Sequence, residues 1–451
     1  MPFFVARCRL TSHLCDFELT SRETCTLLLM RILIEPGSYT CMNMGDVAMM
    51  QVCVSRLAKL WPDAEFGIVT QSPERLALFC PKARAIIESG KEYWFEDKLF
   101  GTATSFLPPG LRARLQGGEI WLRAGWPGAV SSLLAAKRRL KAIDRRGLRG
   151  FVKAVLRSDL VVASGMGMVN DEFRDRALQM LATLEMADQQ GIPTAMLCQG
   201  LGPVSDIELM AALKRVLPKV RVISLRESVY GQQVLQALNY PTERLSLAGD
   251  DGLQLAFENR SPDVGHSIGV NLRVAKYSQI EGAMVSAMRR ALESVAAKLQ
   301  TAFIPVPILF RDDSDVKTAA ALVSGYEDPT CGSPLMTPLD VIQRIGRCRV
   351  VVTGSYHGAV FALGQGIPAI AVAKSRYYLG KFKGLKEQFG DGCQLIDWSD
   401  HVESEELVSA IERAWVLAAE SRPLLLKVAE HQIRNATDAY RNLYASVSRR
   451  N

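Results

Sequence analysis

The segment VVTGSYHGAVFALGQGIPAIAVA, residues Val351–Ala373, decides the fold class. It contains an apolar β-rich run, a glycine-bounded turn that carries His357, a helical stretch and a second apolar run. A strand, a tight turn, a helix and another strand in direct succession are typical of a β-α-β unit. The segment therefore predicts an α/β fold built on a parallel sheet.

The same alternation of β-rich runs and helical periods extends through most of the chain. The first unit is the strand ILI at 32–34, the loop EPGSYTCMNMGD and a helix from about Val47, whose apolar residues recur on one face. Further strands are expected at 66–69, 159–163, 194–198, 220–225 and 245–247, and in the segments SIGVNL, TAFIPV, RVVVTG and IPAIAV. Later helices are expected at 281–299, 339–345, 405–419 and 422–444.

A break in composition at ENRSPDVGHS, residues 258–267, divides the chain. The length of 451 residues suits two domains of about 200 residues each better than one core. We therefore predict two Rossmann-like, doubly wound domains that face a cleft, at 30–258 and 266–420. A C-terminal helix is expected at 421–451.

Composition excludes several classes of protein. With 48% hydrophobic and 22% charged residues the chain is globular, and its best apolar run, 358–373, is interrupted too often to cross a bilayer. Residues 1–29 lack the pattern of a signal peptide and are expected to form a poorly ordered extension before a start at Met30. The ten cysteines are scattered without a CxxC pair, which favours a reducing, cytoplasmic location and no metal.

The positive charge is concentrated in one segment, residues 111–153. That segment holds eleven Lys or Arg against two acids and so carries a net charge of +9. Since the whole chain has a net charge of +7, the rest of the chain carries −2. It also contains Trp121 and Trp126 and lies within an insertion that we place at about 94–153. A basic amphipathic helix with tryptophans fits peripheral contact with an anionic membrane at the inner face. A solvated insertion without a partner is the alternative, and no nucleic-acid module accompanies the charge.

Loops at the carboxyl ends of strands hold the candidate site residues, because open parallel sheets bind ligands there. The loop CMNMGD contains Asn43, Gly45 and Asp46, which can cap the following helix or present a carboxylate to the cleft. The loop ASGMGMVND contains Gly165 and Asn170, where glycines allow either a close approach to a ligand or merely a tight turn.

Basic side chains follow several of the later strands. In SLRESVY, Arg226 offers a fork for phosphate or carboxylate, or a surface ion pair. His357 begins a helix, and the helix dipole favours anions and a neutral imidazole. His357 can therefore act as an acid, as a base or as a hydrogen-bond donor to a phosphate, or it can simply pack there. The segment LRVAKY is expected across the same cleft, and KSRYYLGKFKG adds cations that either join the site or form a solvated face.

Seven of these segments, in order, resemble the polysaccharide pyruvyl transferase family. They are PGSYTCMNMGDVAMMQ, LVVASGMGMVND, LCQGLGPV, VISLRESVYGQQVLQALNY, LAGDDGLQLA, IGVNLR and VVTGSYHGAVFALGQGIPAI, and they span roughly 31–390. The resemblance implies a two-domain fold of the GT-B type. It also implies transfer of a pyruvyl group from phosphoenolpyruvate to two hydroxyls of a sugar, which forms a cyclic ketal, with no cofactor.

The resemblance also suggests roles for the residues found above. His357 would act as the acid or phosphate-side donor and Asp46 as a base on the acceptor side. The donor site is expected to contain Arg226, Arg273, Ser355, Gly358, Lys374 and Lys381, in the second domain and at its border. The acceptor site is expected to contain Asn43, Gly45, Gly165 and Asn170, in the first.

The chain departs from the family pattern at Ser355. Many members carry an arginine two residues before the histidine, so another cation, Lys374 or Lys381, would have to replace it. The expected acceptor belongs to an exopolysaccharide or cell-surface glycan, and a lipid-linked oligosaccharide is one form of it. Two alternatives stay open: a GT-B glycosyltransferase that uses a sugar nucleotide, and a catalytically silent scaffold in polysaccharide assembly.

Overall fold

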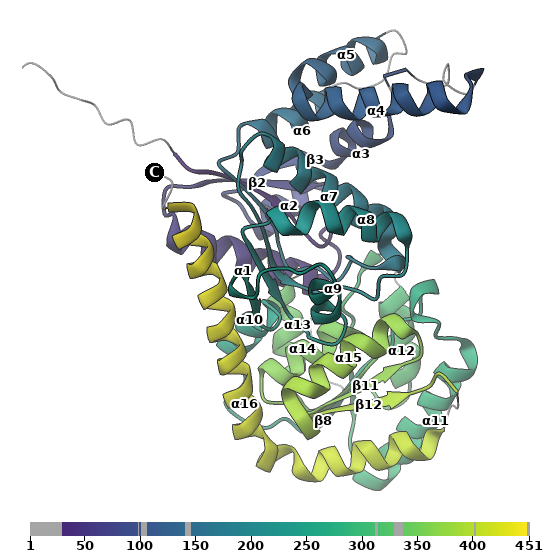
Figure 1. Ribbon diagram of the computed structural model, residues 1–451. Helices are drawn as coiled ribbons and strands as arrows, with labels where there is room; N and C mark the ends of the chain where they lie inside the picture. Colours follow the sequence, from purple (N-terminus) through teal and green to yellow (C-terminus); the bar gives the residue numbers. More distant parts are fainter. Residues whose placement is uncertain are drawn as a thin grey trace, which may run out of the picture.

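The computed structural model describes residues 29–97, 99–100, 106–139, 146–311, 314–328, 337–400 and 403–448. Their strands form two parallel sheets, one of seven strands in the order β3-β2-β1-β4-β5-β6-β7 and one of five in the order β12-β11-β10-β8-β9. Both orders reverse direction once, between β1 and β4 and between β10 and β8, as in doubly wound folds. The predicted pair of Rossmann-like α/β domains is thus confirmed, and Figure 1 shows one above the other.

All strands of the seven-stranded sheet come from the first part of the chain. They are β1 (Arg31–Glu35), β2 (Glu65–Thr70), β3 (Arg84–Ile87), β4 (Leu160–Ala163), β5 (Thr194–Gln199), β6 (Val222–Leu225) and β7 (Leu245–Leu247). The helices between them are α1 (Met44–Leu60), α2 (Pro73–Phe79), α3 (Glu88–Glu96), α4 (Pro109–Gly125), α5 (Pro127–Arg139), α6 (Arg146–Leu156), α7 (Arg174–Gln189), α8 (Ile207–Val216) and α9 (Gly231–Ala237). The helix α10 (Gly252–Glu258) follows the last strand.

The five-stranded sheet comes from the second part of the chain. Its strands are β8 (Ser267–Asn271), β9 (Phe303–Pro305), β10 (Cys348–Thr353), β11 (Ala369–Ala373) and β12 (Cys393–Asp397). The helices are α11 (Gly282–Leu299), α12 (Ser314–Val323), α13 (Pro338–Ile345), α14 (Tyr356–Gly364), α15 (Arg376–Phe389) and α16 (Ser404–Ser448). Sequence patterns missed two edge strands, β3 and β12, because each is short and only partly buried, so neither shows a clear apolar run.

Side chains that alternate along the buried strands divide the interior into three cores. In β1, Ile32 and Ile34 face a core that also contains Val351 of β10, so this core is shared by both domains. Leu33 points to the outer core of the first domain, and Val352 to the outer core of the second. Because successive residues of a strand point to opposite faces, each sheet is covered on both sides, and its central strands are mostly apolar.

Backbone hydrogen bonds tie the start of α1 to the second domain. The amide of Met44 donates to the carbonyl of Ile308 (2.9 Å), and the amide of Phe310 donates to the carbonyl of Met42 (2.9 Å). These bonds place the loop after β1 directly against the loop after β9. The border between the domains is therefore a defined contact at the edge where both sheets present their carboxyl ends.

The last helix differs from the sequence prediction. Two closing helices were expected, but α16 is continuous from Ser404 to Ser448, with Pro423 inside it. Figure 1 shows that α16 runs along the second domain, bends and then ascends along the first. A proline inside a helix lacks the amide hydrogen of one intrahelical bond and bends the helix without having to end it.

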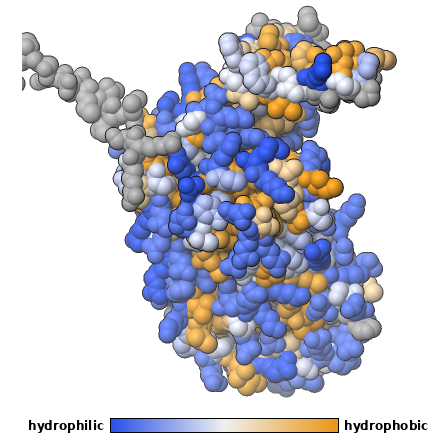
Figure 2. Space-filling view, viewed as in Figure 1, coloured by the Kyte–Doolittle hydropathy of each residue, from blue (hydrophilic) through white to orange (hydrophobic). Residues whose placement is uncertain are grey.

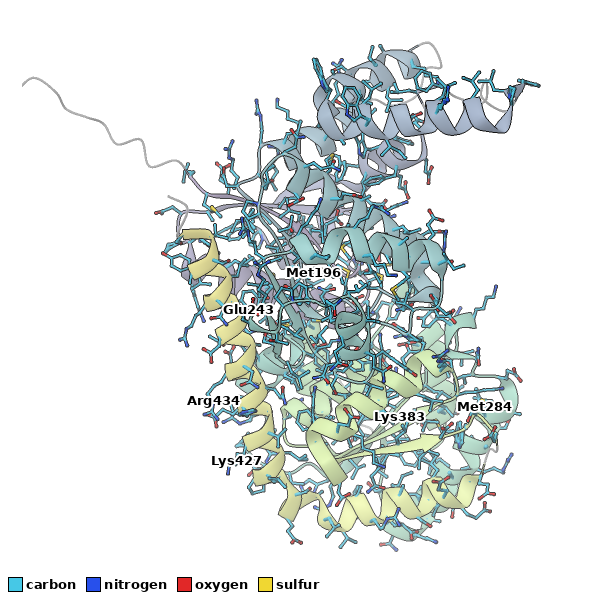
Figure 3. The ribbon with its side chains drawn as sticks, in the orientation of Figure 1. Met196, Glu243, Met284, Lys383, Lys427 and Arg434 are labelled. Atoms are coloured by element: carbon cyan, nitrogen blue, oxygen red, sulfur yellow. The ribbon has the colours of Figure 1, made fainter. Side chains whose placement is uncertain are left out.

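The second half of α16 is held against the first domain by buried side chains. The hydroxyl of Tyr440 donates to Asp251 (2.6 Å), and Arg56 of α1 forms a buried ion pair with the same carboxylate. The Tyr444 ring lies 4.9 Å from the Trp61 ring, centroid to centroid. The outer face of this half of α16 is charged, and Lys427 and Arg434 project from it to solvent in Figure 3.

The basic insertion is helical and only partly packed. Helix α6 is part of the outer core, with Leu148, Phe151 and Val155 fully buried. Helix α5 adds Val130, Leu134 and Ala135 to the same core, and α4 and α5 project from the top of the first domain in Figure 1. No helix in the described ranges is long and apolar enough to cross a membrane. Of the expected extension 1–29, only residue 29 falls within the described residues.

Candidate active site

A cavity of about 630 Å³ lies where the carboxyl ends of the two sheets meet. Its walls come from the loops after β1 and β4 in the first domain and after β8 and β10 in the second, which flank the two points where the strand orders reverse. Open α/β sheets bind ligands at this position. Seven predicted site residues line the cavity: Asn43, Asp46, Arg226, Arg273, Ser355, His357 and Lys381.

The turn between β10 and α14 is shaped by Thr353. Its hydroxyl accepts a hydrogen bond from the amide of Ser355 (2.9 Å), and a Cβ at Gly358 would come within 2.5 Å of it. Gly358 therefore allows the first turn of α14 to pack on the end of β10, and it does not line the cavity. This packing brings Ser355, Tyr356 and His357 to the cavity wall at the N-terminus of the helix.

His357 is buried and lacks a hydrogen bond at Nε2. This atom lies 3.8 Å from Oδ2 of Asp250, beyond hydrogen-bond distance, and it has no other partner among the described residues. Burial, together with the nearby charges of Arg226, Lys381 and Arg273, holds the pKa of His357 well below its usual range. The imidazole is consequently neutral near pH 7 in the unliganded protein.

Arg226 is the central cation of the site. Its side chain is 1% exposed, with Nε donating to Glu227 (2.9 Å) and Nη1 donating to Asp250 (3.0 Å). Its Nη2 has no hydrogen-bond partner in the part of the chain that the structure describes. The guanidinium carbon lies 4.3 Å from the centroid of the Tyr356 ring, whose buried hydroxyl is also unpaired. Burial raises the pKa of Asp250 to about 6 although Arg226 opposes the shift.

Lys381 lies beside Arg226 across the loop after β4. A Cβ at Gly167 would come within 2.3 Å of both Arg226 Nη2 and Lys381 Nζ, so both cations contact the same point of the backbone. Burial and the charge of Arg226 hold the pKa of Lys381 well below its usual range. Its ammonium also donates to the hydroxyl of Tyr377 and lies 4.0 Å from the centroid of that ring. Two adjacent buried cations favour an anionic ligand.

Arg273 is fixed by a carboxylate of its own domain. Its Nε and Nη2 form a bidentate pair with Asp315, with Nη2 at 2.7 Å from Oδ2, and its Nη1 donates to the hydroxyl of Tyr277 (3.0 Å). Asp315 also accepts from the amide of Leu309 (3.0 Å). Arg273 therefore contributes positive charge to the cavity from a rigid position.

The loop CMNMGD fulfils both interpretations considered for it. Asn43 caps α1 by accepting hydrogen bonds from the amides of Gly45 (3.1 Å) and Asp46 (3.4 Å). Asp46 lines the cavity with its carboxylate close to Gly37. Burial raises the pKa of Asp46, although Arg226 and Lys381 act against the shift.

Besides Gly358, four predicted residues lie outside the cavity wall. Gly45 packs against His357, Gly165 packs against Met49, and Asn170 donates to the carbonyl of Gly167 (2.9 Å) and shapes that loop. Lys374 lies 3.7 Å from Glu281 in an ion pair at the surface, and it is not brought to the cavity. Lys381, in the following helix α15, lines the same cavity as Ser355.

The cavity continues into a polar region formed by the first domain. Gln71 donates to Glu88 (2.8 Å), and Glu92 lies close enough to Glu88 for burial and their repulsion to raise the pKa of Glu92. The Arg176 guanidinium lies 4.4 Å from the centroid of the Tyr39 ring, and its Nη2 is buried without a partner in the described structure. This end of the cavity thus presents carboxylates, an amide and an aromatic ring.

Several site residues were not predicted from the sequence. They are Tyr39, Glu88, Glu92, Arg176, Glu227, Asp250, Tyr356 and Tyr377. Glu227 and Asp250 stand inside segments already singled out, SLRESVY and LAGDDG, so their positions beside predicted loops were a usable signal. Tyr377 stands in KSRYYLGKFKG, which was singled out for its cations alone, whereas Arg176 lies in an ordinary helical period and gave no signal. In the described residues no three His, Cys, Asp or Glu side chains are grouped as a metal site requires.

Comparisons with solved structures confirm the GT-B type of fold. UDP-GlcNAc 2-epimerase from Neisseria meningitidis is 13% identical, with a TM-score of 0.52 over 94% of this chain and 100% of that one. A putative UDP-N-acetylglucosamine 2-epimerase from Listeria monocytogenes is 12% identical (TM-score 0.51; 89% and 91% covered). The UGT2 of Phytolacca americana is 11% identical (TM-score 0.51; 93% and 100% covered). At such identities the likeness concerns the fold alone.

Sequence comparison identifies the family. Among curated proteins no match to this sequence is found. The family model described as polysaccharide pyruvyl transferase matches residues 43–376, which is most of the chain and includes Asp46, Arg226 and His357. Lys381 lies just beyond the matched range. On this match, and in agreement with the resemblance of its loops, the chain belongs to the polysaccharide pyruvyl transferase family.

Proposed function

We propose that the protein transfers a pyruvyl group from phosphoenolpyruvate to two hydroxyls of a sugar and so forms a cyclic ketal. The observation that carries this proposal is a set of buried polar atoms on residues that line the cavity, each without a hydrogen-bond partner in the described structure: Arg226 Nη2, Tyr356 Oη and His357 Nε2. A buried donor without a partner costs about 1–3 kcal/mol, which a ligand that accepts its hydrogen bond recovers. A ligand rich in acceptor oxygens fits this set.

Phosphoenolpyruvate carries two anionic groups, a phosphate and a carboxylate. Arg226 and Lys381, beside each other at Gly167, suit the phosphate, whereas Arg273, which Asp315 holds at the cavity wall, suits the carboxylate. The N-terminus of α14 adds the positive end of a helix dipole. Lys381 thereby supplies the positive charge that many family members have in an arginine at the position of Ser355.

The reaction needs one proton donor and one proton acceptor. A proton added to the methylene carbon makes a methyl group and leaves the adjacent carbon cationic, and a sugar hydroxyl attacks that carbon and loses its proton. The bond from that carbon to the phosphate oxygen then breaks, phosphate leaves with the electron pair, and the second hydroxyl closes the ring. Of the two hydroxyl protons, one replaces the proton given to the methyl group and the other leaves with phosphate.

His357 and Asp46 are suited to these two tasks. A bound phosphate would raise the depressed pKa of His357 and allow it to carry the proton that it donates. Asp46, whose pKa burial already raises, is a stronger base than an exposed carboxylate. The polar region with Gln71, Glu88 and Glu92 suits the hydroxyls of the acceptor sugar. No metal or cofactor takes part in these steps.

The acceptor that we propose is a sugar of an exopolysaccharide or cell-surface glycan precursor, modified in the cytoplasm. A lipid-linked oligosaccharide is the form that a cytoplasmic enzyme can reach at the membrane. The assay measures phosphate release from phosphoenolpyruvate with free and lipid-linked galactosides. No release with any such acceptor, together with sugar transfer from a sugar nucleotide, would replace this proposal by the glycosyltransferase alternative.

A further inference from the structure

Helices α4 and α5 expose apolar side chains at the part of the molecule farthest from the second domain. On the helices these are Ile120 (68%), Trp121 (66%) and Leu133 (60%), and beside them are Trp126 between the two helices (63%) and Phe106 just before α4 (90%). Figure 2 shows hydrophobic residues gathered on these projecting helices. Large apolar side chains exposed together on one element mark an interaction surface.

Helix α4 turns one pair of ionic side chains inward. Arg123 Nη2 lies 2.6 Å from Oε1 of Glu119, and both side chains are largely buried. The Arg123 guanidinium also lies 4.9 Å from the centroid of the Trp94 ring, and Glu119 accepts from the amide of Leu99 (3.0 Å). These contacts fix the rotation of α4, and as a result Ile120 and Trp121 face solvent.

The exposed faces combine apolar and basic side chains. On α4, Leu111, Arg114 and Trp121 follow at helical spacing and are all exposed. On α5, Leu133 and Lys137 are exposed four residues apart. Glycines at 110, 117, 118 and 125 have no atom within 4 Å of the position of a Cβ, so nothing in the described structure covers this side of α4.

We propose that this surface, named here the α4–α5 face, docks onto an anionic lipid bilayer. Tryptophan and aliphatic side chains enter the interface between headgroups and acyl chains, while lysine and arginine bind anionic headgroups. Among the described residues of α4 and α5 the one acid, Glu119, is buried, so the face presents Arg114 and Lys137 without an exposed carboxylate, and two copies of it would repel each other. Anionic lipid is complementary to both properties of the face.

Docking at this face places the bilayer on the acceptor side of the cavity. Helix α3, which carries Glu88 and Glu92 at the cavity wall, packs along α6 of the insertion. The surface itself does not depend on the reaction, but its use for a lipid-linked acceptor rests on the function proposed above.

The test is sedimentation of the full chain with vesicles in the absence of substrates, so its failure is separate from failure of pyruvyl transfer. The vesicles consist of phosphatidylcholine alone or of equal parts of phosphatidylcholine and phosphatidylglycerol. We expect binding only to the anionic vesicles, weakening as salt rises. The triple variant Ile120→Ser, Trp121→Ser and Leu133→Ser should reduce it by about tenfold or more, and Arg114→Gln with Lys137→Gln should reduce it too.

The matched control removes equally exposed apolar residues elsewhere, with Leu78→Ser, Ile207→Ser and Val416→Ser (76%, 87% and 71% exposed). It should bind as the unchanged protein does. Absent binding to anionic vesicles, or equal binding by the triple variant, would overturn the proposal. Self-association in sedimentation velocity that the triple variant abolishes would also overturn it and assign the α4–α5 face to a second copy.

Discussion

Gly45 at the start of α1 lies directly against the ring of His357 at the start of α14. A Cβ at Gly45 would come within 2.0 Å of Cγ and 2.2 Å of Nδ1 of His357. The position of the imidazole is therefore set by a residue of the other domain. Gly45→Ala should displace the ring and lower kcat by about a hundredfold, as misplacement of a catalytic group by an ångström does.

The matched control for that substitution is Gly282→Ala in the first turn of α11, where no atom lies within 4 Å of the new Cβ. It should leave kcat unchanged. Circular dichroism checks that both variants fold. Normal turnover by Gly45→Ala would show that the position of His357 is not critical.

Binding of phosphoenolpyruvate should take up protons. Burial and neighbouring cations depress the pKa of His357 and Lys381 in the unliganded protein. A bound anion favours the charged form of each group and raises both pKa values, so protons move from buffer to protein. Calorimetry in buffers of different ionisation enthalpy measures this uptake, which His357→Gln should reduce. Proton release on binding would contradict the assignment of the anion site.

Acid should destabilise the fold through His357. Because its pKa in the fold is below its value of about 6.5 in the unfolded chain, its contribution to stability is present above that pH. Stability is then lost as the pH falls from about 6.5 towards the lower pKa, since the unfolded chain binds the proton first. His357→Gln should flatten this part of the profile of melting temperature against pH.

Lys381→Gln should weaken binding of phosphoenolpyruvate. The substitution removes one of the two cations beside Gly167, and a hydrogen bond to a charged group contributes about 2 kcal/mol. Its loss corresponds to about a thirtyfold lower kcat/KM. Lys383→Gln is the matched control on the same helix, because Lys383 is exposed and labelled in Figure 3 on the second domain. Equal kinetics for both variants would remove Lys381 from the donor site.

Asp251→Ala should destabilise the protein strongly. Its carboxylate holds Arg56 and Tyr440 in a buried cluster, and removing one partner of a buried ion pair costs about 3–5 kcal/mol. Thermal unfolding measures the change. The control is Asp438→Ala on α16. It removes the exposed ion-pair partner of Arg441 and should change the melting temperature little.

The fold was predictable where strands are fully buried. The runs around Ile32, Val161 and Val351 are apolar on both faces because helices cover both sides of each sheet, and such runs are distinct in sequence. The edge strand at Arg84–Ile87 has one buried residue and gave no pattern. Two helices were expected at 405–419 and 422–444, but both halves of α16 are packed and the helix continues through Pro423.

The site was predictable where a loop follows a strand directly. Asp46, Arg226 and His357 stand at such positions, and the cavity contains them. The choice between Lys374 and Lys381 was not open to sequence reasoning, because it depends on which side of α15 faces the cleft. Asp250 and Glu227 were missed because their role depends on an ion pair with the buried guanidinium of Arg226, and that contact exists only in the folded chain.

The bent helix α16 also bears on the order in which the protein folds during synthesis. Residues Leu425 to Leu443 cover a core to which α1 contributes Cys53 and Leu57, so that part of the first domain stays open until the ribosome has made the whole second domain. A chain that folds domain by domain exposes such a surface for the time in between.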